Sequence, residues 1–214
     1  MRRPLVKSSA ITLIEVLIVL AVILTLAVAF LPAALRRAQA RSCRINCTNN
    51  LKQIGLAFQT WAIDNNDLYP TEVSVTLGGA MEAAITNLPF IFQVMSNELS
   101  TPKVLACPED DRRVCATNFY TMARRNISYF VGLDATATNP ACILSGDGNI
   151  TNGMGVRAGI LYVATTDPAG WTSSPHKGRG NLLFADGSVQ QVSTKLLREA
   201  IANTSFQTNR LLMP

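Results

Sequence analysis

Histidine is almost absent from this sequence, because His176 is the only one among its 214 residues. Any catalytic scheme that depends on an imidazole must therefore use His176. A hydrolase built from His176 and a neighbouring serine, Ser173 or Ser174, lacks the nucleophile elbow that would present the serine to a substrate. We therefore expect this protein not to be an enzyme.

Three other binding patterns are missing as well. Paired C-x-x-C knuckles are absent, and with a single histidine this disfavours a zinc site. No segment fits G-x-x-x-x-G-K-[ST] or G-x-G-x-x-G, so the glycines of residues 146–155 are expected to form a flexible connection rather than a phosphate-binding loop. The net charge is +5, but the basic residues are scattered and form no stripe interleaved with aromatic residues. We therefore expect no nucleic-acid partner.

A long apolar run stands out near the start of the chain. Between Ile11 and Leu35 the only polar side chains are those of Thr12, Glu15 and Thr25. About 20 apolar residues in a helix span a bilayer core of roughly 30 Å. The run therefore predicts a single membrane span, and it raises the question of why an acid stands inside it.

Two ordinary membrane signals explain only part of this run. A secretory signal peptide accounts for the basic residues Arg2, Arg3 and Lys7, with cleavage after the small residues 27–29 or 38–40. The run is longer, however, than the roughly 7–15 residues of a signal-peptide core. A plain single-pass anchor explains the length but not the acid.

The chain has an odd number of cysteines, so at least one thiol is unpaired or intermolecular. Disulfides are plausible in a chain that is delivered across a membrane. Cys43 and Cys47 lie four residues apart on one predicted helix, where Cβ atoms are about 5–6 Å apart. A disulfide prefers roughly 3.8 Å. We therefore expect one of these two to pair with one of the later cysteines, and the pairing stays open. The later cysteines are Cys107, Cys115 and Cys142.

The segment SAITLIEVLIVLAV, residues 9–22, resembles the processing motif of type IV prepilins and type II secretion pseudopilins. In that family a short basic leader is cut just before the hydrophobic helix, and a glutamate follows at the fifth position. The resemblance implies cleavage between Ala10 and Ile11, N-methylation of Ile11, and an assembly role for Glu15. The family usually has glycine and phenylalanine at the cut, where this chain has Ala10 and Ile11.

The implied cut explains the acid in physical terms. It creates a charged amine at Ile11, inside or near the apolar layer, and an unpaired buried ion is costly whereas a paired one is tolerated. Glu15 of one subunit is expected to neutralise the Ile11 amine of its neighbour as the helices stack. The alternative is a glutamate that extends toward the lipid headgroups or is simply protonated.

Helical periodicity continues beyond the apolar run, with buried-type residues at three- and four-residue spacings. This pattern predicts one long helix over 8–63, which Pro32 kinks or locally breaks. The residues of the stripe are Cys43, Cys47, Leu51, Ile54, Phe58 and Trp61.

The rest of the chain indicates strands and a closing helix. Strands are predicted over 127–133, 141–147 and 158–165, and a closing helix over 193–202. A hairpin over 180–193 is predicted to turn at Asp186-Gly187, with both residues at positive φ.

Together with the prepilin resemblance, these elements imply an α+β, pilin-like fold. A long N-terminal helix, transmembrane in its first half, packs on a small antiparallel sheet of three to five strands with a C-terminal helix. The expected parts are a leader (1–10), a transmembrane and assembly helix (11–35), an amphipathic continuation (36–64) and a globular head (65–214).

His176 and Asp186-Gly187 form the pattern H-x9-D-G. With the leader, it resembles a C-terminal signature of bacterial pseudopilin-like proteins, many from planctomycete and verrucomicrobial lineages. We expect His176 to cap or hydrogen-bond the Asp186 turn. A weaker alternative is calcium bound by Asp147 and Asp186, because some type II pseudopilins bind calcium through acidic loops. The matching body motifs are CTNNLKQIGLAFQTWA (47–62), CPED (107–110), NISYFVGLDA (126–135) and LSGDGN (144–149).

The resemblance implies a structural subunit of a pilus or a type II secretion-type pseudopilus. Its partners are expected to be a prepilin peptidase/methyltransferase, inner-membrane assembly machinery, membrane lipid, and other copies of itself or related pilins. It is expected to cross the bacterial inner membrane once, with its head in the periplasm or in an extracellular filament. The alternative is a membrane-anchored binding domain on the outer side of that membrane that never polymerises. No cofactor is expected apart from the calcium alternative.

Overall fold

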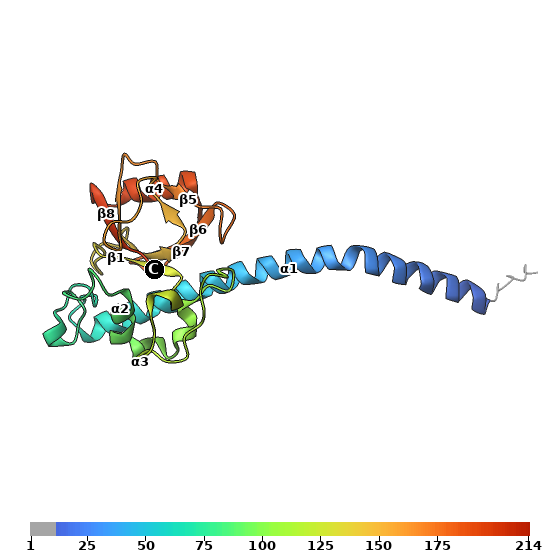
Figure 1. Cartoon of the computed structure of the whole chain (residues 1–214), viewed down its shortest axis with the longest axis horizontal. Coiled ribbons are helices and arrows are strands. Elements are labelled where there is room, and N and C mark those ends of the chain that lie inside the picture. The colour runs from blue at the N-terminus through green and yellow to red at the C-terminus, as the bar shows by residue number, and fades with distance from the viewer. Residues whose placement is uncertain (1–11) are drawn as a thin grey trace, which may run out of the picture. The chain divides into compact units, whose positions relative to one another are not determined.

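The computed structural model describes residues 12–214, and Figure 1 shows their helices and strands. The predicted leader and the cleavage site between Ala10 and Ile11 lie outside the described residues. The chain divides into two compact units. The first ends at Ser42, and the second, which we call the globular unit, comprises Cys43–Pro214.

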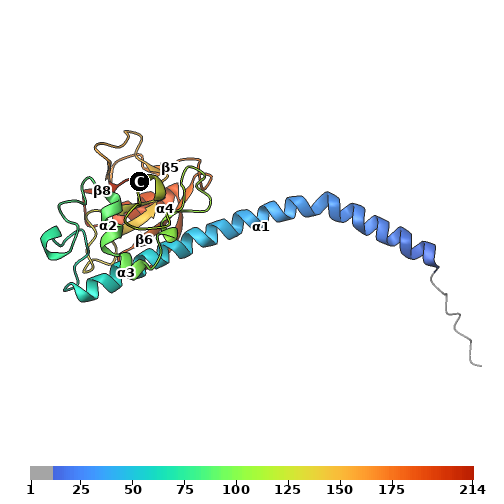
Figure 2. The ribbon, with the colours of Figure 1, turned by 60° about the horizontal axis from the view of Figure 1, so that its bottom comes forward.

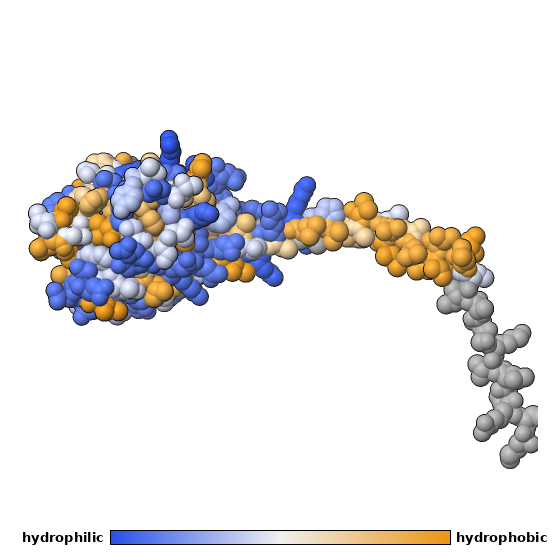
Figure 3. Space-filling model, turned by 90° about the horizontal axis from the view of Figure 1, so that it is seen from below, coloured by the Kyte–Doolittle hydropathy of each residue, from blue (hydrophilic) through white to orange (hydrophobic). Residues whose placement is uncertain are grey.

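Helix α1 (Leu13–Asp64) contains 52 residues and contributes to both units. In the first unit its large apolar side chains are exposed, from Leu13 (78 %) to Leu35 (58 %), and Figure 3 shows them as a nearly continuous hydrophobic surface. The Thr25 hydroxyl donates to the Val22 carbonyl oxygen (2.8 Å), which satisfies a polar group inside the apolar run. The stretch has a mean hydropathy of 3.0 and is long and apolar enough to cross a membrane.

Pro32 lies inside α1, and the helix is not broken there. Proline removes one helical hydrogen bond and crowds the preceding turn, but the hydrogen bonds on either side keep the helix continuous. The helix ends close to the predicted position, where Asn66 and Asp67 adopt positive φ values of 58° and 59°.

The second part of α1 packs into the core of the globular unit. One stripe of its side chains is buried, as the three- and four-residue spacing predicts, except that Cys43, the first residue of the predicted stripe, is only half-buried. Burying each large apolar side chain contributes roughly 1.5–3 kcal/mol. The stripe consists of Cys47, Leu51, Ile54, Phe58 and Trp61, none more than 6 % exposed.

Six antiparallel strands form the main sheet, in the order β4-β8-β1-β2-β6-β7. The α+β class is thus confirmed, with one strand more than the predicted maximum. The strands are β1 (Tyr129–Gly132), β2 (Ile143–Asp147), β4 (Ile160–Ala164), β6 (Arg179–Phe184), β7 (Val189–Ser193) and β8 (Thr208–Leu212). A second ribbon pairs β3 (Ile150–Thr151) with β5 (Gly170–Trp171).

Both faces of the sheet are covered. Successive strand residues point to opposite sides, so each strand contributes side chains to both cores. In β1, Tyr129 and Val131 belong to the core that includes α1, whereas Phe130 belongs to the core that includes α4 (Thr194–Asn203). Figures 1 and 2 show the sheet lying between α4 and the second part of α1.

Short helices connect α1 to the sheet. Among them, the 3-10 helix η2 leads directly into the loop that carries Cys107. They are η1 (Val75–Leu77), α2 (Leu88–Val94), α3 (Ser96–Leu99), η2 (Pro102–Leu105) and η3 (Arg124–Asn126).

The hairpin between β6 and β7 turns where predicted but with a different geometry. Gly187 has a φ of 82°, whereas Asp186 is not at positive φ. The Gly187 N–H donates to the Phe184 carbonyl oxygen (2.9 Å), and the Phe184 N–H donates to the Ser188 carbonyl oxygen (3.0 Å). These bonds close a three-residue loop in which only the glycine needs the left-handed region. The predicted two-residue turn is therefore wrong.

Candidate functional site

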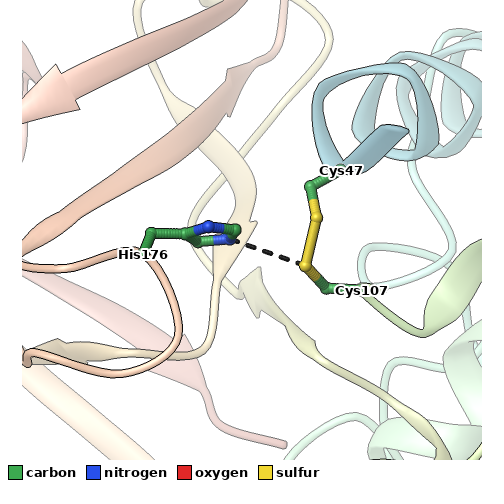
Figure 4. Close-up of side chains that lie close together, drawn as sticks. All are labelled: Cys47, Cys107 and His176. Atoms are coloured by element: carbon green, nitrogen blue, oxygen red, sulfur yellow. Dashed lines mark hydrogen bonds between the residues drawn. A yellow bond between two sulfur atoms is a disulfide. The ribbon is translucent and has the colours of Figure 1, made fainter. Parts of the chain in front are cut away.

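Three motifs that lie far apart in the sequence meet in one buried cluster of the globular unit. Cys47 projects from α1, Cys107 follows η2, and His176 lies in the loop between β5 and β6. Cys47 and Cys107 form a disulfide with a Cα–Cα distance of 5.3 Å, within the usual range. Figure 4 shows the His176 ring facing this disulfide. Their exposed fractions are 0 %, 4 % and 1 %.

The His176 ring is held between two carboxylates. Its Nδ1 atom lies 2.8 Å from Oε2 of Glu109. Its Nε2 atom lies 3.3 Å from Oδ2 of Asp147 and 3.5 Å from Sγ of Cys107. Both ring nitrogens therefore face groups that bind a proton or a metal, and neither faces solvent.

These surroundings set the charge of the ring. Burial by itself lowers the pKa of His176, but hydrogen bonding and charge from Asp147, followed by those from Glu109, outweigh it and raise the pKa above its usual value of 6.5. In the disulfide form the two carboxylates thus stabilise an imidazolium. Nε of Arg44 lies 4.0 Å from Oε2 of Glu109 and adds a second cation at the edge of the cluster.

Asp147 is held in place by Asn181 of β6. Its Oδ2 atom accepts hydrogen bonds from the backbone N–H (2.7 Å) and the side-chain amide (2.8 Å) of Asn181. The Thr48 hydroxyl donates to Oδ1 of Asn181 (3.3 Å), which orients that amide. Oδ1 of Asp147 is buried and has no hydrogen-bond partner among the described residues. Such an atom costs about 1–3 kcal/mol.

The loop that carries Cys107 is tied to α1 and to the start of β1. The Cys107 N–H donates to the Ser128 hydroxyl (2.9 Å), and the Ser128 N–H donates to the Leu105 carbonyl oxygen (2.8 Å). The Asn50 side-chain amide donates to the Ala106 carbonyl oxygen (3.2 Å). These bonds place the Cys107 sulfur within bonding distance of Cys47.

The loop that carries His176 is closed by Asn149. Its side-chain amide donates to the carbonyl oxygens of Thr172 (3.2 Å) and Arg179 (3.0 Å), and the backbone carbonyl oxygen of Asn149 accepts from the Thr172 N–H (2.8 Å). Both ends of the loop are thus bound to one residue. The LSGDGN motif contributes twice to the cluster, through Asp147 and through Asn149.

The structure separates the two halves of the H-x9-D-G pattern, so the expected bond from His176 to the Asp186 turn is wrong. Oδ1 of Asp186 accepts from the Ser188 N–H instead (2.8 Å). The turn is held by Tyr69, whose hydroxyl donates to the Ala185 carbonyl oxygen (3.1 Å). The two halves of the pattern therefore belong to two separate sites, because the residues of β6 between them carry the chain away from His176.

The two weak calcium candidates also have separate surroundings. Among the described residues, Asp147 contacts His176 and Asn181, whereas Asp186 contacts Ser188 within its own turn. No contact between Asp147 and Asp186 is present in residues 12–214. The remaining cysteines are free: Cys43 is half-buried, Cys115 exposed and Cys142 buried.

Sequence reasoning did not single out Glu109, Asn181 or Arg44. A signal was present for Glu109, because it lies within the CPED motif next to Cys107. No comparable signal exists for Asn181, which acts through a strand that looks apolar in sequence. A surface hollow of about 300 Å³ between α4 and the β6–β7 hairpin contains none of the cluster residues. The cluster is buried and lies apart from this hollow.

The resemblance to pilin-like proteins stands on the residues quoted above. The chain finds no match among protein-family models, curated proteins or solved structures.

Proposed function

We propose that this protein is a pilin-like subunit, cut between Ala10 and Ile11 by a prepilin peptidase/methyltransferase. It assembles into a pilus or a type II secretion-type pseudopilus, with copies of itself or related pilins, through inner-membrane machinery. Before assembly it crosses the bacterial inner membrane once, with the globular unit in the periplasm. No catalytic role is proposed for the globular unit.

One observation carries this proposal. The apolar side chains of α1 in the first unit are exposed, and one carboxylate, that of Glu15, accompanies them. Such a surface is stable only in lipid or against other apolar helices. Outside lipid, packing against neighbouring helices contributes ~25 cal/mol per Å² of apolar area removed from water.

The position of Glu15 favours assembly over simple anchoring. It lies in the first turn of α1, and its Oε2 atom accepts weakly from the Thr12 N–H (3.4 Å). The positive end of the helix dipole stabilises an acid at this place, which keeps the carboxylate available for a neighbour's terminal amine. A plain membrane anchor has no terminal amine of a neighbour to pair with this charge.

Crosslinking in the native cell tests assembly. The full chain, Glu15→Ala and the control Thr25→Ala are compared after treatment with a lysine-reactive crosslinker. We expect ladders of subunits from the wild type and from Thr25→Ala, but only membrane-inserted monomers from Glu15→Ala. Normal ladders from Glu15→Ala contradict the pairing role of the carboxylate. Monomers from the wild type favour the anchored, non-polymerising domain.

A further inference from the structure

The disulfide cluster contains a set of potential metal ligands. The Sγ atoms of Cys47 and Cys107 and a ring nitrogen of His176 lie within 4.8 Å of one another. All three residues are buried. Two thiolates and an imidazole are three of the four ligands of common tetrahedral zinc sites.

A candidate for the fourth ligand lies beside His176. Asp147 is 2 % exposed, and its Oδ2 atom lies 3.3 Å from Nε2 of His176. Its Oδ1 atom has no partner among the described residues. Asn181 orients the carboxylate through Oδ2, so one oxygen is held by hydrogen bonds and the other is left for a cation.

His176 is also oriented as a ligand. Glu109 accepts from Nδ1 at 2.8 Å, which leaves Nε2 facing Cys107 and Asp147. Metal-bound histidines usually donate their other ring N–H to a carboxylate in this way, which fixes the tautomer and increases ligand basicity.

We propose that, after reduction of the Cys47–Cys107 disulfide, this cluster binds a single Zn²⁺ ion through Cys47, Cys107, Nε2 of His176 and Asp147. The centre then has two covalent states, a disulfide and a zinc complex. Both states connect α1 to the loop that carries Cys107. This inference does not depend on filament assembly.

The conversion balances with a dithiol as reductant. The dithiol transfers two electrons to the S–S bond and becomes a cyclic disulfide, and its two protons pass to the cysteine sulfurs. Zn²⁺ then displaces both thiol protons and any proton on Nε2 of His176, which are released to solvent. No other oxidant or reductant is required.

The geometry and the ligand types select the metal. Tetrahedral thiolates about 2.3 Å from zinc lie roughly 3.8 Å apart, so the two sulfurs must separate once the S–S bond is broken. Side-chain rotation at Cys47 and Cys107 supplies this movement. Thiolates and imidazole favour zinc over calcium or magnesium, which prefer oxygen ligands. The sequence disfavoured zinc because it lacks paired knuckles and has one histidine, whereas the proposed ligands come from four separate segments that only the fold brings together.

Cobalt titration of the full chain in detergent micelles tests the proposal. The protein is reduced with dithiothreitol without oxygen, freed of excess reductant, and titrated with Co²⁺. We expect thiolate-to-cobalt charge-transfer absorption and tetrahedral ligand-field bands that saturate at one ion per chain and disappear when Zn²⁺ is added. The oxidised protein is expected to show none of these bands.

Variants distinguish this site from binding by other thiols. Cys43→Ser/Cys115→Ser/Cys142→Ser should retain the full spectrum. His176→Gln and Asp147→Asn should each change the ligand-field bands and weaken binding. Glu109→Ala should weaken binding by about 10–100-fold through loss of histidine orientation. Circular dichroism of each oxidised variant shows whether it has folded.

X-ray absorption of the unmutated zinc complex keeps the test independent of variant folding. Two sulfur and two nitrogen or oxygen ligands at zinc distances support the proposal. Absence of charge-transfer bands in the reduced wild type overturns it, as does a spectrum lost in the triple cysteine variant. A zinc shell without nitrogen or oxygen ligands also overturns it.

Discussion

Nε2 of His176 lies 3.5 Å from Sγ of Cys107, across 69 residues of sequence. This contact joins the loop before β6 to the disulfide that holds α1, so the only histidine of the chain lies at the meeting point of three segments. The same ring contacts Glu109 and Asp147. The stability of the globular unit is therefore expected to depend strongly on this centre.

Loss of the disulfide should be costly. It joins residues 60 positions apart, and chain entropy alone predicts about 4 kcal/mol for a loop of that length. Cys47→Ala/Cys107→Ala should lower the free energy of unfolding by that order, measured by denaturant unfolding in detergent. The exposed Cys115 supplies the control, since Cys115→Ser should leave stability nearly unchanged. A loss below 1 kcal/mol in the double variant would show that the bond is unimportant.

The amide of Asn181 should stabilise Asp147. Asn181→Ala removes the side-chain donor of Asp147 Oδ2 (2.8 Å), and a hydrogen bond to a charged group contributes about 1.5–3 kcal/mol. We expect a destabilisation in this range. Asn139→Ala, which removes a long bond to Ser205 (3.4 Å) and an acceptor for the Ala141 N–H (3.2 Å), both at the surface, should have a smaller effect. Equal unfolding midpoints for the two variants would contradict the buried contact.

Closure of the His176 loop should depend on Asn149. Asn149→Ala removes the amide that binds the Thr172 and Arg179 carbonyl oxygens. Amide hydrogen exchange across residues 172–179 should become faster, while exchange in β4 should stay unchanged. Identical exchange in variant and wild type would mean that other contacts close the loop.

The raised pKa of Tyr69 predicts that the globular unit loses stability at alkaline pH. Burial, followed by the charges of Glu72, Cys142 and Asp186, raises the pKa of Tyr69 from 10.0 to about 12. Because the folded-state pKa is the higher one, this stability is complete below pH 10.0 and is lost as the pH rises toward about 12.

The matched variant isolates this effect. Tyr69→Phe should show a shallower decline of unfolding free energy over that interval. Buried Tyr129, whose pKa is also raised by burial, contributes equally in both proteins. Superimposable pH profiles would exclude Tyr69 as the source.

Local periodicity was sufficient to predict much of the fold. The stripe on α1 and the strands β1, β2, β4, β6 and β7 follow from spacings of side chains that are buried where they were expected. Strand β8 was missed because Asn209 and Arg210 interrupt its apolar pattern. Asn209 is satisfied by Thr204 (3.0 Å) and Arg210 by Asp134 (2.8 Å), contacts that only the folded chain provides.

The candidate site was predictable only in pieces. His176 and the cysteines were recognised by type, but no spacing says that Cys47 meets Cys107 or that both meet His176. These contacts arise because η2 and the β5–β6 loop deliver their residues to one point on α1. The Asp186-Gly187 turn was placed correctly, while its loop length depended on the register of β6 and β7.

The intact mass of the protein purified from its native membrane tests the proposed function most directly. We predict a chain that begins at an N-methylated Ile11. A chain that retains Met1, or that begins at Phe30 or Arg41 as a signal-peptide substrate would, contradicts the proposal, because Glu15 would then have no neighbouring terminal amine to neutralise.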